Sequence, residues 1–253
     1  MSDLSAFSLE GRRIAVTGAN TGIGQGIAVA VARAGGSVLG IGRSAMDETE
    51  QLVKAEGGLF QSVKADIGDT SASVAMLNDL MADGPLDGLV NNAGIIRRAD
   101  SIDFTEEDWD DVMEVNLKSL FFLSQAFGRN CIAAKRAGRI VNIASLLSFQ
   151  GGIRVPSYTA SKHGVLGITR LLANEWAAKG INVNAIAPGY IETNNTEALR
   201  NDADRSKALL ERIPAGRWGL AGDIGDAAVF LLARASNYMH GAVIPVDGGW
   251  LAR

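Results

Sequence analysis

Short β-branched runs alternate with amphipathic stretches along the whole chain, and this alternation constrains the fold more than any other feature. The run Arg13-Ile-Ala-Val-Thr17 precedes residues 23–34, whose apolar side chains recur at helical spacing. Further strand-like runs lie at residues 37–41, 62–65, 86–90, 138–143, 182–186 and 242–246. Strands that alternate with helices pair in parallel through right-handed crossovers. The sequence therefore predicts an α/β fold, with a doubly wound parallel β-sheet flanked by helices on both faces.

No linker rich in proline, glycine or serine interrupts this alternation, so we expect one domain that spans residues 1–253. Apolar residues make up 47% of the chain, which is enough for a full core. Residues 191–214 are polar and helix-prone and lie between two strand-like parts. We predict that they form a mobile insertion that covers the substrate.

Charge and composition narrow the range of partners. The formal net charge is −4 and no basic run is present, which disfavours nucleic acid and acidic membrane surfaces. The longest apolar stretches are too short to span a membrane. The single cysteine, Cys131, fits a reducing compartment, and the first ten residues resemble no secretion signal. We therefore expect a cytoplasmic protein with a small-molecule partner.

A glycine-rich turn, Thr17-Gly-Ala-Asn-Thr-Gly-Ile-Gly24, follows the first strand and opens the first helix. Such a turn also occurs for structural reasons alone. Between a strand and a helix, however, glycines let the backbone approach a pyrophosphate, and the helix N-terminus offers free N–H groups. This position favours dinucleotide binding on a Rossmann-type sheet. The predicted contacts are Gly18, Asn20, Thr21, Gly22, Ile23 and Gly24.

The second strand ends in Gly40-Ile-Gly-Arg43, without the acid that commonly binds the ribose of NAD. Arg43 is suited to a 2′-phosphate, which favours NADP. Two alternatives stay open at this point, namely stacking of Arg43 on the adenine and a solvent-exposed Arg43.

Tyr158 and Lys162 are four residues apart and share one face of a predicted helix. A free tyrosine has a pKa of about 10, and a nearby cation lowers it toward the range of a working acid/base. On a helix surface the same spacing produces a solvated pair by chance. Ser145, however, follows the strand of residues 138–143, at the edge where open α/β sheets bind ligands. Its hydroxyl is predicted to hydrogen-bond the substrate oxygen.

Together with Asp66, Asn91-Asn-Ala-Gly94, Asn116 and the segment Pro188–Thr193, these motifs resemble the short-chain dehydrogenase/reductase family along essentially the whole chain. The resemblance implies hydride transfer between a nicotinamide cofactor and an alcohol or ketone carbon, with no metal, in a homotetramer. It implies that Tyr158 is the acid/base, that Lys162 also binds the nicotinamide ribose, and that Asn116 holds a proton-conducting water. The implied cofactor contacts are Asp66 and Ile67 at the adenine, Asn92, Ala93 and Gly94 beside the cofactor, and Pro188, Gly189, Ile191 and Thr193 around the nicotinamide.

Segments 94–98, 148–158, 212–219 and 247–253 resemble family members that act on deoxy sugar acids. This likeness implies NAD and a substrate of the 2-deoxy-D-gluconate or 2-dehydro-3-deoxy-D-gluconate type. Ser145 and Tyr158 would then contact the substrate, Arg154 would hold its carboxylate, and Gln150 would lie nearby. A solvent-exposed or intersubunit Arg154 is an equal alternative. The lesser candidates for the carboxylate are Arg97, Arg98 and Arg217.

Two other functions stay open. The same chemistry can serve another polyol or carbonyl substrate, and the same fold can serve a non-catalytic dinucleotide sensor.

Overall fold

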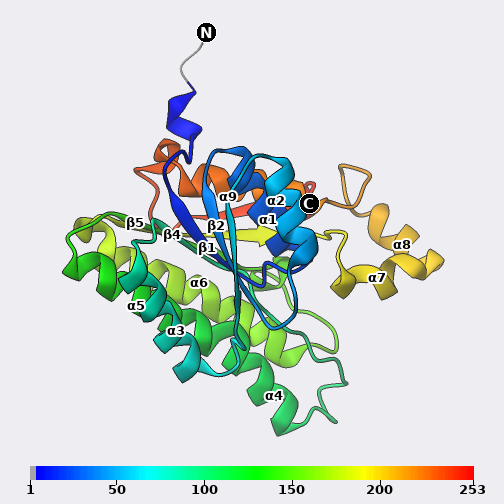
Figure 1. The fold of residues 1–253 in the computed structure, drawn as a ribbon. Helices are drawn as coiled ribbons and strands as arrows, with labels where there is room; N and C mark the ends of the chain where they lie inside the picture. Colours follow the sequence, from blue (N-terminus) through cyan, green and yellow to red (C-terminus); the bar gives the residue numbers. More distant parts are fainter. Residues whose placement is uncertain (1–3) are drawn as a thin grey trace.

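The computed structural model of the protein describes residues 4–253 and contains a seven-stranded, all-parallel sheet in the order β3-β2-β1-β4-β5-β6-β7 (Figure 1). This order confirms the predicted doubly wound sheet. The strands are β1 (Arg13–Thr17), β2 (Ser37–Gly42), β3 (Phe60–Lys64), β4 (Gly88–Asn91), β5 (Gly138–Ile143), β6 (Ile181–Pro188) and β7 (Val243–Val246).

Helices cover both faces of the sheet (Figure 1). One face carries α1 (Gly22–Arg33), α2 (Asp47–Ala55) and α9 (Ala221–Leu232), and α1 packs closely against α9. The other face carries α3 (Thr70–Asp83), α5 (Ser119–Ala133) and α6 (Pro156–Trp176), with α4 (Glu106–Met113) packed on α6. Within residues 4–253, no helix is long and apolar enough to cross a lipid bilayer.

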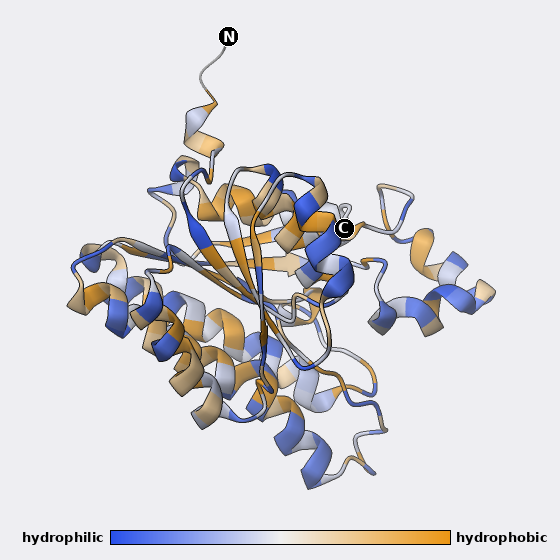
Figure 2. Ribbon diagram, in the orientation of Figure 1, coloured by the Kyte–Doolittle hydropathy of each residue, from blue (hydrophilic) through white to orange (hydrophobic). Residues whose placement is uncertain are grey.

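The side-chain alternation along each buried strand supplies two cores, one on each face. In β1, Ile14 and Val16 pack with α1 and α9, whereas Ala15 packs with α3, α5 and α6. Both faces of the inner strands are buried, which explains why apolar residues predominate in their sequences. Figure 2 shows the consequence, with apolar strands enclosed by helices whose outward faces are polar.

The helix boundaries differ from the predicted ones by a few residues. The predicted helix that carries Tyr158 and Lys162 runs from Pro156 to Trp176, because proline is favourable at a first helical position and a short 3-10 turn, Ala177–Lys179, follows. The segment predicted as a mobile insertion contains α7 (Asn194–Asn201) and α8 (Ala203–Leu210), and α8 has no buried residue. Its mobility stays a prediction.

Candidate active site

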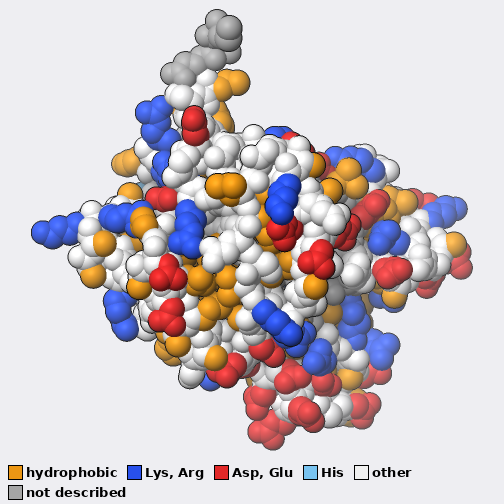
Figure 3. Space-filling view, in the orientation of Figure 1, with side chains coloured by type: hydrophobic (Ala, Val, Ile, Leu, Met, Phe, Trp, Pro, Cys, Tyr) orange, Lys and Arg blue, Asp and Glu red, His pale blue; other side chains and the backbone are white. Residues whose placement is uncertain are grey.

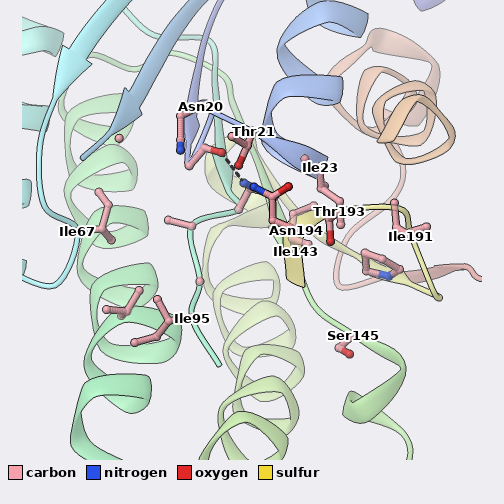
Figure 4. A pocket seen from close by; sticks show the side chains of 18 of the residues that line it. Asn20, Thr21, Ile23, Ile67, Ile95, Ile143, Ser145, Ile191, Thr193 and Asn194 are labelled. Atoms are coloured by element: carbon pink, nitrogen blue, oxygen red, sulfur yellow. Dashed lines mark hydrogen bonds between the residues drawn. The ribbon is translucent and has the colours of Figure 1, made fainter. Parts of the chain in front are cut away.

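A cleft of about 520 Å³ runs along the edge of the sheet where the strands end. Its walls come from the glycine turn after β1, the ends of β2, β4, β5 and β6, and the start of α7 (Figure 4). The chain leaves β1 toward β2 on one side, and β4 lies on the other side of β1. This is the switch point at which doubly wound sheets bind their ligands.

The glycine turn is shaped for close approach of a ligand. Gly18 and Gly22 have φ angles of +67° and +57°, a region that side chains disfavour. A Cβ on Gly24 would lie 2.1 Å from the carbonyl oxygen of Gly18. Thr21, which caps α1, makes no side-chain capping hydrogen bond, so the first N–H groups of α1 are left for an anion. The turn therefore fits a pyrophosphate.

Asn92, just after β4, is hydrogen-bonded to this turn. Its side-chain amide donates hydrogen bonds to the carbonyl oxygens of Thr17 (2.9 Å) and Gly18 (3.2 Å). The hydroxyl of Thr17 in turn accepts from the backbone N–H groups of Asn92 and Ala93, each at 3.0 Å. The segment predicted to border the cofactor is thus bonded directly to the predicted phosphate-binding turn.

Polar groups gather at the far end of the cleft, beyond the glycine turn. Arg43 and Asp66 both line the cleft, and Nη1 of Arg43 lies 3.9 Å from Oδ2 of Asp66. Their side chains are 69% and 57% exposed, so both are accessible to a ligand. Asn20 donates to the hydroxyl of Ser44 at 3.0 Å. Arg43, Ser44 and Asn20 thus form a group of polar side chains in the cleft where β2 ends.

Three of the four predicted catalytic side chains meet at the other end of the cleft. Ser145, Tyr158 and Lys162 all line it, Ser145 after β5 and the other two from α6. Nζ of Lys162 lies 5.6 Å from the ring centroid of Tyr158 and donates to the carbonyl oxygen of Ile143 at 2.7 Å. The helical spacing therefore brings the phenol and the ammonium to one place.

The environment shifts the pKa of both groups. Burial lowers the pKa of Lys162 to about 8. Burial also raises the pKa of Tyr158, while a hydrogen bond with Ser145 and the positive charge of Arg98 act in the lowering direction. The net direction for Tyr158 is opposite to the lowering that we expected from Lys162. The reason is that desolvation of the phenolate outweighs the favourable contacts of the protein alone.

Ser145 is held in place by its own short helix. It caps the 3-10 turn Leu146–Ser148, and its hydroxyl accepts from the N–H of Leu147 at 3.1 Å. The hydroxyl of Ser148 accepts from the N–H of Ser145 at 3.2 Å and donates to the carbonyl oxygen of Lys162 at 2.6 Å. Ser148 therefore connects α6 to the turn that contains Ser145. Ser148 had not been predicted as a site residue.

Asn116 lies behind the cleft and does not line it. It is buried in a π-helical turn, Glu114–Lys118, between α4 and α5. Its side chain accepts from the N–H of Ile95 (2.8 Å) and donates to the carbonyl of Ile95 (2.9 Å). Its amide nitrogen also lies 3.4 Å from the hydroxyl of Ser161 on α6. These contacts fix the chain after β4, and the predicted water stays a prediction.

The two predicted substrate residues outside the catalytic set do not line the cleft. Arg154 forms an ion pair with Asp100, with Nε 3.0 Å from Oδ1, and both side chains are largely exposed. Gln150 accepts a hydrogen bond from the indole of Trp250 at 3.0 Å. The structure therefore gives both side chains protein partners.

Two of the lesser arginine candidates are also paired with carboxylates. Arg97 lies 3.2 Å from Asp108 and 2.9 Å from Asp111 of α4, over which acidic side chains gather in Figure 3. Arg217 lies 2.8 Å from Asp223 at the start of α9.

All predicted cofactor contacts except Gly24 line the cleft. Gly24 lies under the turn, against Gly18. Several lining residues were not predicted from the sequence. Most of them lie at or just after the end of a strand, which is a signal that could have identified them. The missed residues are Gly42, Ser44, Ala65, Ile95, Val115, Ile143, Ala144, Asn194 and Thr196.

Comparisons with known proteins agree with this geometry. A family model described as enoyl-(acyl carrier protein) reductase matches residues 18–251. The chain is 57% identical, over 99% of both sequences, to 2-dehydro-3-deoxy-D-gluconate 5-dehydrogenase of Dickeya dadantii.

Two solved structures extend the comparison. One, from Agrobacterium tumefaciens, is provisionally named 2-deoxy-D-gluconate 3-dehydrogenase and contains bound NADP. It is 64% identical with a TM-score of 0.94, over 98% of this chain and 99% of that one. The other, a short-chain type dehydrogenase/reductase from Mycobacterium marinum, is 31% identical with a TM-score of 0.93 over the full length of both chains. The protein therefore belongs to the short-chain dehydrogenase/reductase family of nicotinamide-dependent oxidoreductases.

Proposed function

We propose that the protein interconverts a secondary alcohol and a ketone of a deoxy sugar acid, 2-dehydro-3-deoxy-D-gluconate, with NADP as the redox partner. The observation that carries this proposal is the convergence of Ser145, Tyr158 and Lys162 at one end of a cleft whose other end holds the glycine turn and Arg43. The substrate follows from the name of the Dickeya dadantii relative.

The cofactor, when bound, supplies or accepts the hydride. The chain's own residues transfer the proton. Tyr158 is positioned to give a proton to the ketone oxygen or to take one from the alcohol, and Ser145 to hydrogen-bond the same oxygen. Because burial raises the pKa of Tyr158, its phenol is protonated near neutrality and is ready for ketone reduction. Oxidation requires the phenolate, which the ammonium of Lys162 is positioned to stabilise.

The direct test is a turnover assay with the purified protein. We expect a change in the absorbance of reduced nicotinamide with 2-dehydro-3-deoxy-D-gluconate, and weaker turnover with neutral polyols, because these lack the carboxylate. Acyl thioesters and uncharged ketones serve as comparison substrates. Turnover of one of those alone would replace the proposed substrate. Tight cofactor binding without turnover of any substrate would instead indicate a dinucleotide sensor.

The preference for NADP depends on Arg43. No acid follows β2, and the guanidinium of Arg43 is accessible beside Ser44 and Asn20. Replacing Arg43 with Ala is expected to raise the KM for NADP by about tenfold, because a charge-assisted contact with the 2′-phosphate is lost. The KM for NAD should change little. Steady-state kinetics with both cofactors measure this, with Arg43→Lys as the charge-conserving control. Equal KM changes for NAD and NADP would contradict the assignment.

The homotetramer implied by the family resemblance is part of this proposal, and sedimentation velocity tests it.

A further inference from the structure

An aromatic wall of Tyr190, Trp218 and Trp250 begins just after β6, beside residues that line the cleft and outside the lining itself. Tyr190 lies between Gly189 and Ile191, both of which line the cleft. Its ring packs edge-on against Trp218 (centroids 5.7 Å apart) and tilted against Trp250 (4.8 Å). Burial raises the pKa of Tyr190, so its hydroxyl stays a neutral hydrogen-bond donor at physiological pH. The wall therefore lies next to the predicted nicotinamide pocket and carries a donor.

Trp250 connects this wall to the turn that carries Ser145. It packs in one buried cluster with Leu146, the residue after Ser145, and its indole N–H donates to Gln150 at 3.0 Å. Two hydrogen bonds hold the C-terminal segment against the residues that follow α8, one from the N–H of Ala215 to the carbonyl of Gly248 at 2.9 Å and one from the Arg253 side chain to the carbonyl of Glu211 at 2.6 Å. Figure 1 shows the C-terminus beside that segment. Trp250 is thus fixed between Ser145 and Tyr190.

Arg212 lies on the face of this fixed indole. Its guanidinium carbon is 4.1 Å from the ring centroid of Trp250, a cation–π geometry that pre-organises the side chain. Arg212 makes no ion pair within residues 4–253, in contrast to Arg97, Arg154 and Arg217. The side chain is exposed, and its charge acts on Tyr190 in the direction that lowers the pKa. A guanidinium stacked in this way keeps its N–H edge available for an anion.

We propose that Arg212 and Tyr190 bind the carboxylate of the sugar-acid substrate. This inference rests on the proposed function and names the residues that select for an acid. The reacting carbon must lie at Ser145 and Tyr158, and the carboxylate lies at the end of the carbon chain. Trp250, which packs on Tyr190 and shares one buried cluster with Leu146, connects the two proposed subsites. The three arginines paired with Asp or Glu residues would have to break an ion pair first.

The test compares an acidic and a neutral substrate in the Arg212→Gln variant. With the sugar acid, kcat/KM is expected to fall by about 10- to 100-fold, the range for a lost charge-assisted hydrogen-bonded pair. With the corresponding uncharged amide, kcat/KM should stay within about twofold of that of the wild type, as should the KM for NADP. Arg212→Lys should recover part of the loss. Lys207→Gln, which removes an exposed charge from α8 in the same segment, is the matched control.

The outcomes separate the two proposals. If the wild-type protein turns over no sugar acid, the proposed function fails. If the wild type does so but Arg212→Gln keeps its kcat/KM for the acid, or loses equally for the acid and the amide, the carboxylate assignment is overturned. A loss with the acid alone, at an unchanged melting temperature, supports it, because a merely structural role would affect both substrates.

Discussion

The Tyr158→Phe variant is expected to lose about a thousandfold in kcat, the range typical of a removed general acid/base, while keeping its affinity for NADP. The substitution deletes only the phenolic oxygen. The ring keeps its place on α6, and Lys162 keeps its hydrogen bond to the carbonyl of Ile143 at 2.7 Å. Ser145 also stays in position, because it is held by Leu147 and Ser148 and not by the phenol alone. The substitution should therefore lower kcat and leave the affinity for NADP unchanged.

Steady-state turnover and calorimetric NADP titration measure these two properties, and thermal melting checks that the variant is folded. Tyr238→Phe is the matched control, because Tyr238 is 99% exposed and distant in sequence from the cleft residues. The control should retain wild-type turnover. A Tyr158→Phe protein with turnover within about tenfold of the wild type would rule out Tyr158 as the acid/base, because a positioned acid/base contributes at least about a hundredfold.

The fold was predictable from the sequence because its determinants are local. A strand buried on both faces is rich in apolar residues, as in residues 181–188, where only Asn182 and Asn184 are polar. An intervening helix carries apolar residues at helical spacing. The cofactor cleft was predictable for a related reason. In a parallel sheet, residues that follow different strands meet at one edge, so Gly18, Asp66 and Asn92 share a cleft although they are distant in sequence.

The substrate end of the cleft was not predictable in this way. Whether an arginine is available to a ligand depends on which carboxylates lie beside it in space. Arg154 follows the turn that carries Ser145, yet it pairs with Asp100. Gln150 is bonded to Trp250, a hundred positions away. Neither contact leaves a local pattern. Segment 212–219 resembles sugar-acid enzymes, but the sequence does not show which of its two arginines, Arg212 or Arg217, is paired with a carboxylate.

The sign of the Tyr158 shift was missed for the same reason. Sequence spacing shows that a lysine lies one turn from the tyrosine, but it does not show how deeply the two are buried. Burial disfavours the charged form of each group, which raises the pKa of Tyr158 and lowers that of Lys162. Burial of Tyr158 and Lys162 therefore disfavours both the phenolate and the ammonium in the protein without a ligand.

Replacing Lys162 with Met is expected to reduce turnover strongly and to remove a specific pH dependence of stability. Lys162 is only 4% exposed, and burial lowers its pKa from 10.5 to about 8. Between those two values the unfolded chain holds a proton that the folded chain has released, so the free energy of unfolding rises with pH. Below pH 8 or so both states are protonated and this contribution is lost.

The size of the effect follows from the shift. A lowering from 10.5 to about 8 corresponds to roughly 3 kcal/mol, at 1.36 kcal/mol per pKa unit. Tyr158 and Cys131 have raised pKa values and act in the opposite direction at alkaline pH, so the wild-type curve alone is not diagnostic. The difference between wild type and Lys162→Met, measured by urea unfolding at neutral pH and at about pH 9.5, isolates the lysine.

A difference that grows by about 2 kcal/mol in favour of the wild type over that pH range is the expected result. Lys179→Met, at an exposed position just after α6, should show no such growth. A flat difference would mean that Lys162 keeps an ordinary pKa and stays fully charged in the fold. The lysine would then stabilise the phenolate of Tyr158 even without cofactor. A growing difference means that Lys162 loses its charge as the pH rises through about 8, so its support of the Tyr158 phenolate weakens over the same pH range.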